Sequence, residues 1–153
     1  MRKVNVFAPD FEYAETRPAG YRAGHAQLGP ALGATLISAT VYELPPGEST
    51  WPYHYEHGAE EWVLVLAGRP TLRHPHGEDE LAAGDLVCFP DGPDGAHKLT
   101  NRGAQTARVM ILSTTGRPAV AVYPDSDKVG VWPAAGESML LRREGVDYWD
   151  GEA

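Results

Sequence analysis

Histidine and glutamate side chains that could share a metal ion are gathered in one short stretch of the sequence. His54, Glu56 and Glu61 lie within it, and His97 follows well downstream. Neutral imidazoles and carboxylates are common ligands of divalent ions, provided that several of them converge on one point. The only cysteine, Cys88, excludes an internal disulfide and a cluster of thiolate ligands. A metal site in this protein must therefore rest mainly on histidines and carboxylates.

Strand alternation predicts which of these side chains share a face, because residues i and i+2 of an extended chain point the same way. On an extended segment, His54 and Glu56 lie on one face and His57 lies on the other. Glu61 stands at the start of an apolar run, where it can face the interior. The alternation around His97 also turns that imidazole inward.

Short strands are the elements that must position these residues. The chain has 17 glycines and 13 prolines, which favour turns over long helices. Apolar or alternating runs between turn signals predict strands at 34–44, 61–67, 70–73, 86–89, 97–101, 107–114 and 119–123. Such closely spaced strands are typical of an all-β sandwich or barrel. Cys88 is expected to be a small core residue, and residues 138–143 to form one helical turn.

The remaining histidines have simpler interpretations. His74 and His76 are predicted to lie at an exposed hairpin tip, because no glutamate and glycine follow them at a useful spacing. His25 has no partner by spacing and is expected to be structural. Asn101 is interpreted as a turn or hydrogen-bonding residue rather than a ligand.

Glycines and a proline frame the candidate ligands at regular spacings. The first group has six residues before its histidine, four between its glutamates and six before its last glycine: Gly47, His54, Glu56, Glu61 and Gly68. The second group is Gly84, Pro90, Gly92, His97 and Asn101. The two groups match the two motifs of the cupin superfamily, and the sequence resembles small single-domain bacterial cupins of type 2.

The resemblance implies an all-β fold, a double-stranded β-helix or jelly-roll barrel with short irregular N- and C-terminal extensions. It implies one cupin domain over residues 1–153, with its motif core at 47–101 and a C-terminal extension, 124–153, that packs on the barrel. It also implies one divalent metal ion, held by two histidines and a glutamate of the first motif and by the histidine of the second.

The sequence departs from the family pattern at one ligand, because Glu56 stands where a second histidine is usual. In one interpretation Glu56 replaces that histidine, and the ligands are His54, Glu56, Glu61 and His97. Two carboxylates then favour Fe or Mn, and the general order of affinities keeps Zn and Ni as candidates. In a second interpretation a bulge turns His57 inward. In a third the metal site has been lost.

The leading functional hypothesis is a mononuclear metal-dependent enzyme that acts on a small polar or carbonyl-bearing molecule, as an oxygenase, isomerase or lyase. If Glu56 does not bind the metal, it becomes the candidate general base. A non-catalytic small-molecule-binding or sensor cupin, and a metal-free epimerase-like cupin, are the alternatives. The fold alone does not choose among them.

Composition limits the partners and the location. The formal net charge is -8 and no dense basic cluster occurs, so nucleic acid is not expected as a partner. The sequence has neither an apolar run long enough to span a membrane nor a leader, and a cytoplasmic protein is expected. Resemblance to cupins implies a homodimer. The apolar side chains of Trp62, Leu64 and Leu66 would need cover from the terminal segments or from a second subunit.

Overall fold

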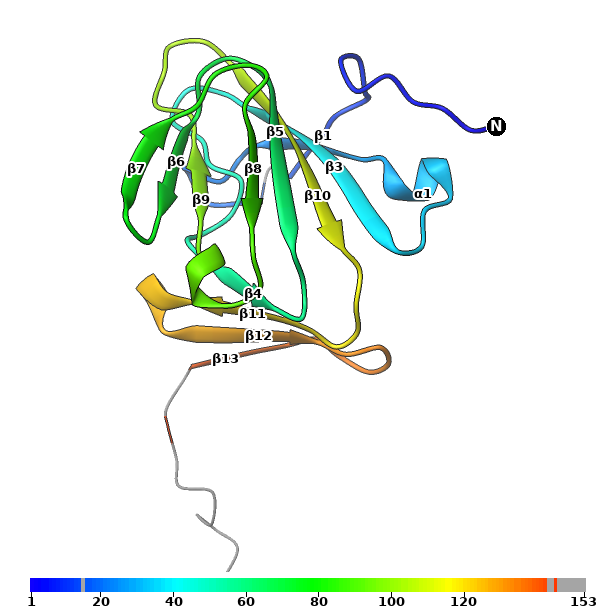
Figure 1. Ribbon diagram of the computed structural model, residues 1–153, viewed down its shortest axis with the longest axis vertical. Coiled ribbons are helices and arrows are strands. Elements are labelled where there is room, and N and C mark those ends of the chain that lie inside the picture. The colour runs from blue at the N-terminus through cyan, green and yellow to red at the C-terminus, as the bar shows by residue number, and fades with distance from the viewer. Residues whose placement is uncertain (15, 143–144, 146–153) are drawn as a thin grey trace, which may run out of the picture.

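The structure is a computed structural model that describes residues 1–14, 16–142 and 145. It consists mainly of short strands joined by turns (Figure 1). The strands are β1 (Glu12–Tyr13), β2 (Gly24–Gln27), β3 (Ile37–Leu44), β4 (Tyr55–His57), β5 (Glu61–Ala67), β6 (Thr71–His74), β7 (Gly77–Glu80), β8 (Leu86–Phe89), β9 (Lys98–Thr100), β10 (Ala107–Thr114), β11 (Ala119–Tyr123), β12 (Lys128–Trp132) and β13 (Met139–Arg142). The helical elements are α1 (Gly29–Leu32), η1 (Pro93–Gly95) and η2 (Pro124–Ser126). Each segment expected to be extended contains a strand, which confirms those predictions.

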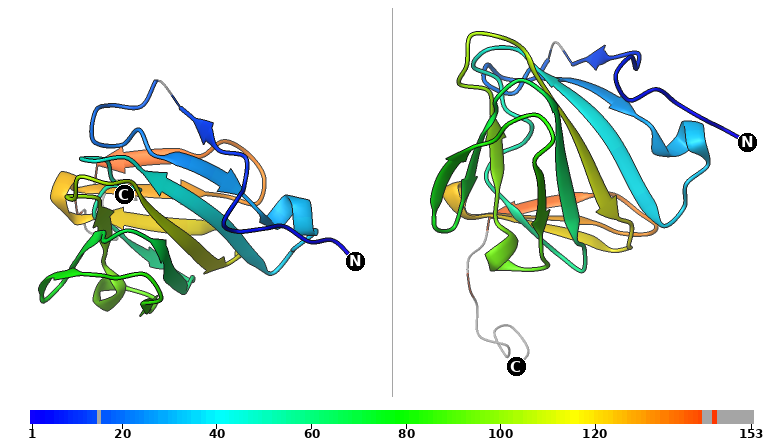
Figure 2. Two further views of the ribbon diagram at one scale, coloured as in Figure 1. Left: turned by 90° about the horizontal axis from the view of Figure 1, so that it is seen from above. Right: turned by 45° about the horizontal axis from the view of Figure 1, so that its top comes forward.

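The strands pair into a six-stranded sheet, β1-β2-β3-β10-β5-β8, and two smaller sheets, β13-β12-β11-β4 and β7-β6-β9. The segment before β4 links the smaller sheets, because Ser49 bridges Thr100 and His54 bridges His97. The smaller sheets therefore make one wall, and the six-stranded sheet makes the other (Figure 2). This antiparallel arrangement is a jelly-roll barrel, as expected.

The core lies between the two walls. Val63 and Val65 on β5 and Val109 on β10 point inward and are almost completely buried. Leu99 on β9 meets them from the opposite wall and is also fully buried. Burying side chains of this size stabilises the folded state by about 1.5–3 kcal/mol each, so the alternation along β5, β9 and β10 fixes their register.

The outer face of the six-stranded sheet is covered along only part of its width. Leu66 packs with Phe11 of the N-terminal segment in a second apolar cluster. Trp62 and Leu86 on the same face remain 38% and 56% exposed, and Ile37 is 53% exposed. The N-terminal segment therefore covers Leu66 but leaves the part of the sheet around β8 uncovered.

Two local predictions are wrong. Within residues 138–143, residues 139–142 form strand β13 rather than a helical turn, because they pair with the free edge of β12. Cys88 is exposed rather than in the core. The side chains of β8 alternate, and it is Phe89, 5% exposed, that points inward.

The C-terminal extension continues the wall made by the smaller sheets. Strands β11, β12 and β13 lie side by side next to β4 (Figure 1). Tyr148 and Trp149, which belong to the predicted extension, lie outside the described residues. In the part of the chain that the structure describes, no helix has the length and apolar character needed to cross a membrane.

Candidate metal site

Three of the predicted ligands are brought together by strand pairing. The backbone amide of His54 donates to the carbonyl of His97 at 3.1 Å, and that of His97 donates back at 2.8 Å. This reciprocal pair places the two imidazoles side by side, with ring centroids 4.8 Å apart. Glu61 enters from the opposite wall as the first residue of β5. Side chains that are far apart in the sequence thus meet inside the barrel.

The ligand atoms of this group converge closely. His97 Nε2 lies 3.4 Å from Glu61 Oε2, and His54 Nε2 lies 3.9 Å from the same oxygen. Possible ligand atoms of all three residues lie within 4.8 Å of one another. Two ligands bound to one ion at the usual distances are separated by about 3–4 Å. The spacing in the structure is therefore close to what a shared ion requires.

Both imidazole rings are oriented by backbone carbonyls. His54 Nδ1 lies 2.9 Å from the carbonyl oxygen of Pro52, and His97 Nδ1 lies 2.9 Å from that of Gly95. Because a carbonyl only accepts, Nδ1 carries the proton in each ring. The Nε2 atoms are left with free lone pairs directed at Glu61, which is the form in which histidine binds metals.

The electrostatics of the group also favour a cation. Burial and the neighbouring Glu56 raise the pKa of Glu61 to about 8. Burial, followed by the proximity of His54, lowers the pKa of His97 to about 3, and burial lowers the pKa of His54. The two neutral imidazoles supply no counter-charge to the carboxylate. A divalent ion would supply it, so the donor set fits such an ion.

Glu56 and His57 point in different directions from β4. Glu56 is outside the group of atoms within 4.8 Å, yet it is near enough to Glu61 to raise that residue's pKa. Burial raises the pKa of Glu56 itself. His57 is half exposed, and its Nδ1 lies 3.3 Å from Asp91 Oδ1 on the outside of the barrel. Strand β4 pairs regularly with β11, and the bulge considered for His57 does not occur there.

Each of the two imidazole rings also packs against an aromatic ring. Phe89 stacks on His97 with ring centroids 3.8 Å apart, and Tyr123 stacks on His54 at 5.8 Å. Burial, with smaller contributions from Glu56 and Glu61, raises the pKa of Tyr123. Tyr123 was not among the site residues predicted from the sequence. It ends β11, and the long-range pairing of β11 with β4, which no local sequence pattern encodes, brings it next to His54.

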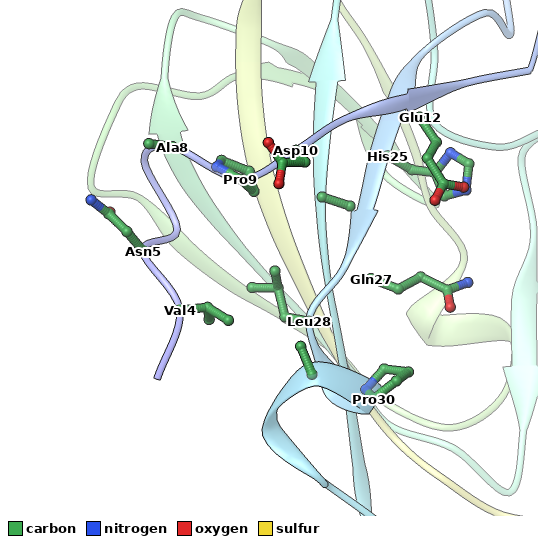
Figure 3. A pocket seen from close by; sticks show the side chains of 12 residues that line it. Val4, Asn5, Ala8, Pro9, Asp10, Glu12, His25, Gln27, Leu28 and Pro30 are labelled. Carbon is green, nitrogen blue, oxygen red and sulfur yellow. The ribbon is translucent and has the colours of Figure 1, made fainter. Parts of the chain in front are cut away.

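The other histidines lie away from this group. His74 and His76 flank the β6–β7 hairpin tip as predicted, and His76 is exposed. His25 lines a separate cavity of about 570 Å³ beside the N-terminal segment, with Nε2 4.0 Å from Glu12 (Figure 3). Asn101 is fully buried and donates to the carbonyls of Leu44 and Gln105, which confirms its hydrogen-bonding role.

Comparison with known families identifies the domain that carries this site. Residues 40–113 match the model of the cupin domain. That range begins within β3, ends within β10 and contains all three converging side chains. The chain therefore contains a cupin domain, in agreement with its jelly-roll fold. No protein of curated function matches the sequence.

Several solved structures are similar to the chain. A candidate sugar phosphate isomerase from Acidithiobacillus ferrooxidans is 27% identical, with a TM-score of 0.76 over 86% of this chain and 83% of the other. A cupin-superfamily sugar phosphate isomerase from Silicibacter pomeroyi is 24% identical, with a TM-score of 0.82 over 94% of each chain. The polyketide cyclase RemF from Streptomyces resistomycificus is 26% identical, with a TM-score of 0.63 over 77% of this chain and 82% of that one.

Proposed function

We propose that this cupin domain binds one divalent metal ion and acts as an enzyme on a small polar or carbonyl-bearing molecule. The observation that carries the proposal is the convergence of His54 Nε2, His97 Nε2 and a carboxylate oxygen of Glu61 inside the barrel. These three residues are the proposed ligands, and Fe, Mn, Zn and Ni all suit two imidazoles and a carboxylate. A bound ion would supply polarisation of a substrate oxygen.

Glu56 is the second functional group of the proposal. Its carboxyl lies near the three ligands but outside their closest group, where it can exchange a proton with a substrate. We propose that Glu56 accepts a proton from a carbon next to a carbonyl group and returns it to a neighbouring atom. A role for Glu56 as a fourth metal ligand is the competing hypothesis, and the variant Glu56→Gln separates the two.

The similar proteins support proton-transfer chemistry of this kind. The Acidithiobacillus protein, at 27% identity, is described as an isomerase, and RemF, at 26% identity, is a cyclase. Isomerisation of a sugar phosphate moves a proton between carbons without a net change in oxidation state. An isomerase is therefore the form of enzyme that we favour for this chain.

Metal analysis tests the first half of the proposal. Protein purified without chelator is expected to carry about one equivalent of a divalent metal, because three ligands converge on one point. Glu61→Gln should lose most of it, while Arg69→Ala, far from the site, should not. Metal content far below one equivalent in the wild-type protein, with none taken up on addition, would refute the proposal.

Proton exchange tests the second half. The metal-loaded protein is incubated in D₂O with aldose phosphates, and nuclear magnetic resonance follows deuterium at the carbon beside the carbonyl. We expect incorporation with the wild-type protein and none with Glu61→Gln. Metal binding without exchange on any substrate offered would favour a non-catalytic binding protein instead.

A further inference from the structure

A pocket of about 460 Å³ lies beside the candidate metal site and has no role so far. Three segments that are distant in the sequence form it: the N-terminal loop, the residues just before His54, and the turn between β11 and β12. Its lining includes two cations, Arg17 and Lys128, and three aromatic rings, those of Tyr21, Trp51 and Tyr53. Concave sites with aromatic walls and a few charged groups are typical of small-molecule binding.

Cations lie on the aromatic rings around this pocket. The guanidinium of Arg17 is 4.6 Å from the ring centroid of Trp51, and that of Arg73 is 3.9 Å from that of Tyr53. Lys98 Nζ is 5.0 Å from the ring centroid of Tyr21 and donates to its hydroxyl. Stacking of this kind fixes the position of a cation without neutralising its charge.

Lys128, the first residue of β12, adds a further cation to the pocket. Its Nζ lies 5.6 Å from the ring centroid of Tyr123. Positive charge is therefore concentrated around one pocket of a protein whose net charge is -8. Charge gathered against the sign of the whole molecule is expected where an anion binds.

Part of this positive charge has no carboxylate partner among the described residues. In the described chain, Arg17, Lys98 and Lys128 form no ion pair, although Lys98 contributes, after Arg73, to lowering the pKa of Asp125. Asp125 also lines the pocket, but both its oxygens are held by the guanidinium of Arg73, at 2.5 and 2.9 Å. Among the described residues, Arg17 Nη1 is buried without a hydrogen-bond partner. An unpaired buried donor destabilises the folded chain, and an anionic ligand that draws the guanidinium toward it would offset that loss.

Two series of contacts connect the lining of the pocket with the candidate metal site. Lys128 lies over Tyr123, which stacks on His54. On the other side, Trp51 Nε1 donates to the hydroxyl of Tyr42 at 3.1 Å, and Tyr42 is close enough to Glu61 for that carboxyl to raise its pKa. A molecule held in the pocket thus contacts Lys128 and Trp51, and one further residue separates each of these from a proposed ligand.

We propose that this pocket binds the phosphate group of a small phosphorylated molecule, with Arg17 and Lys128 as its charged contacts. The inference rests on the proposed function, for which it names the substrate class. Phosphate suits the pocket better than a carboxylate because its several oxygens can accept from cations on separate segments. The ring faces of Trp51 and Tyr21 pack against the rest of the ligand.

Calorimetric titration tests the inference with ribose 5-phosphate, glucose 6-phosphate and glyceraldehyde 3-phosphate as probes. Ribose, ribonate and inorganic phosphate are titrated for comparison, to show whether the phosphate group, a carboxylate or the sugar is what the pocket binds. We expect at least one sugar phosphate to bind, ribose to be much weaker, and ribonate to be weaker than ribose 5-phosphate. Binding of inorganic phosphate alone as tightly as the sugar phosphates would show that the aromatic walls contribute nothing.

Matched variants locate the site. Arg17→Ala and Lys128→Ala should each weaken binding by about 10-fold or more, as expected for loss of a charge-assisted hydrogen bond. Arg69→Ala removes the same charge from an exposed pair with Glu80 and should change binding less than about 2-fold. Circular dichroism checks that each variant is folded. Equal effects of all three variants, or no binding of any sugar phosphate, would overturn the inference.

The same titration on chelator-treated protein separates this inference from the proposed function. Arg17 and Lys128 do not belong to the metal group, so phosphate binding should persist without metal and in Glu61→Gln. If metal binding fails but sugar phosphates bind, the pocket is right and the enzyme proposal is wrong. If metal binds and sugar phosphates do not, the enzyme proposal stands and the inference fails.

Discussion

The imidazoles at the centre of the barrel are prepared for a ligand by contacts that the motif alone does not specify. Backbone carbonyls fix the Nδ1 protons of His54 and His97, and the rings of Phe89 and Tyr123 hold the imidazole planes. Oriented ligands of this kind bind metal more tightly, because little side-chain entropy is lost on binding. Precision at the site is therefore a property of the neighbouring residues as well as of the ligands.

Glu56→Gln distinguishes the two roles considered for this residue. A glutamine cannot accept the proton, so a general base should lose at least about 100-fold in proton-exchange rate while metal content stays near one equivalent. His57→Ala is the control and should leave both quantities unchanged, because its imidazole lies outside beside Asp91. Loss of metal in Glu56→Gln would instead identify Glu56 as a ligand.

Asn101 is expected to matter for stability rather than chemistry. Its amide joins the carbonyls of Leu44 and Gln105 and accepts from the backbone amide of Gly103, all at a fully buried position. Asn101→Ala leaves these groups without partners and should lower the free energy of unfolding by about 2–4 kcal/mol. Urea unfolding measures the change. Asn5→Ala, at an exposed position, should cost less than about 0.5 kcal/mol, and an equal loss would contradict the assignment.

For single residues, the sequence predicted those positions that motif spacing and strand alternation determine. His54, Glu61 and His97 come together as expected, because His54 and His97 pair on one wall and Glu61 faces them from the start of β5. Tyr123 could not be predicted, since its contact with His54 depends on the pairing of β11 with β4, a long-range choice that no local pattern encodes. Cys88 was misplaced because one residue of register separates the inner and outer faces of a strand.

Neighbouring strands are joined by charged side chains on the outside of the barrel. Glu43 on β3 accepts from Arg108 on β10 at 2.7 Å and from the hydroxyl of Tyr13 on β1. Burial raises the pKa of Glu43, but the hydrogen bonds from Tyr13 and Arg108 outweigh it, so the pKa lies below its usual value of 4.5. This cluster ties β1 and β10 to opposite sides of the β2–β3 pair.

The sign of the shift predicts a pH dependence for the cluster. Because the pKa of Glu43 is lower in the folded chain than in the unfolded chain, its stabilisation is complete above about pH 5 and disappears as the pH falls through the folded value. Glu43→Gln should therefore cost about 0.5–1 kcal/mol at pH 7 and progressively less below pH 4.5. Urea unfolding between pH 7 and pH 3 measures the difference. A difference that stays constant with pH would contradict this account.

Strands were predicted correctly where glycine or proline turns mark their ends. The prediction failed where pairing with a distant strand determines the secondary structure. The runs 61–67, 86–89, 107–114 and 119–123 were bounded by glycine or proline turns and match β5, β8, β10 and β11 in their limits. Residues 138–143 contain no glycine or proline turn, and a helical turn was predicted there. Their leucines have good helix propensity, but the open edge of β12 offers backbone partners, and tertiary pairing overrides propensity.

The whole molecule has an apolar surface that the described chain leaves uncovered. Leu86 and Cys88 on β8, Trp62 on β5 and Ile37 on β3 lie exposed on the outer side of the six-stranded sheet. Clustered exposed side chains of this size are unusual on a monomer and mark association surfaces. We expect a second copy of this chain to cover them, in agreement with the homodimer that the cupin resemblance implied.

Sedimentation of charged variants tests this expectation. The wild-type protein is expected to sediment as a dimer at micromolar concentration, and Leu86→Glu as a monomer, because a two-fold interface brings the same carboxylate from each subunit into one apolar contact. Leu140→Glu, at a leucine that is 58% exposed on β13 of the other wall, is the matched control and should remain dimeric. Cys88 gives an independent reading, since alkylation should be slow in the dimer and faster in Leu86→Glu. A monomeric wild-type protein would refute the dimer. Dissociation by Leu140→Glu but not by Leu86→Glu would place the interface on the other wall rather than on the face that carries Leu86 and Cys88.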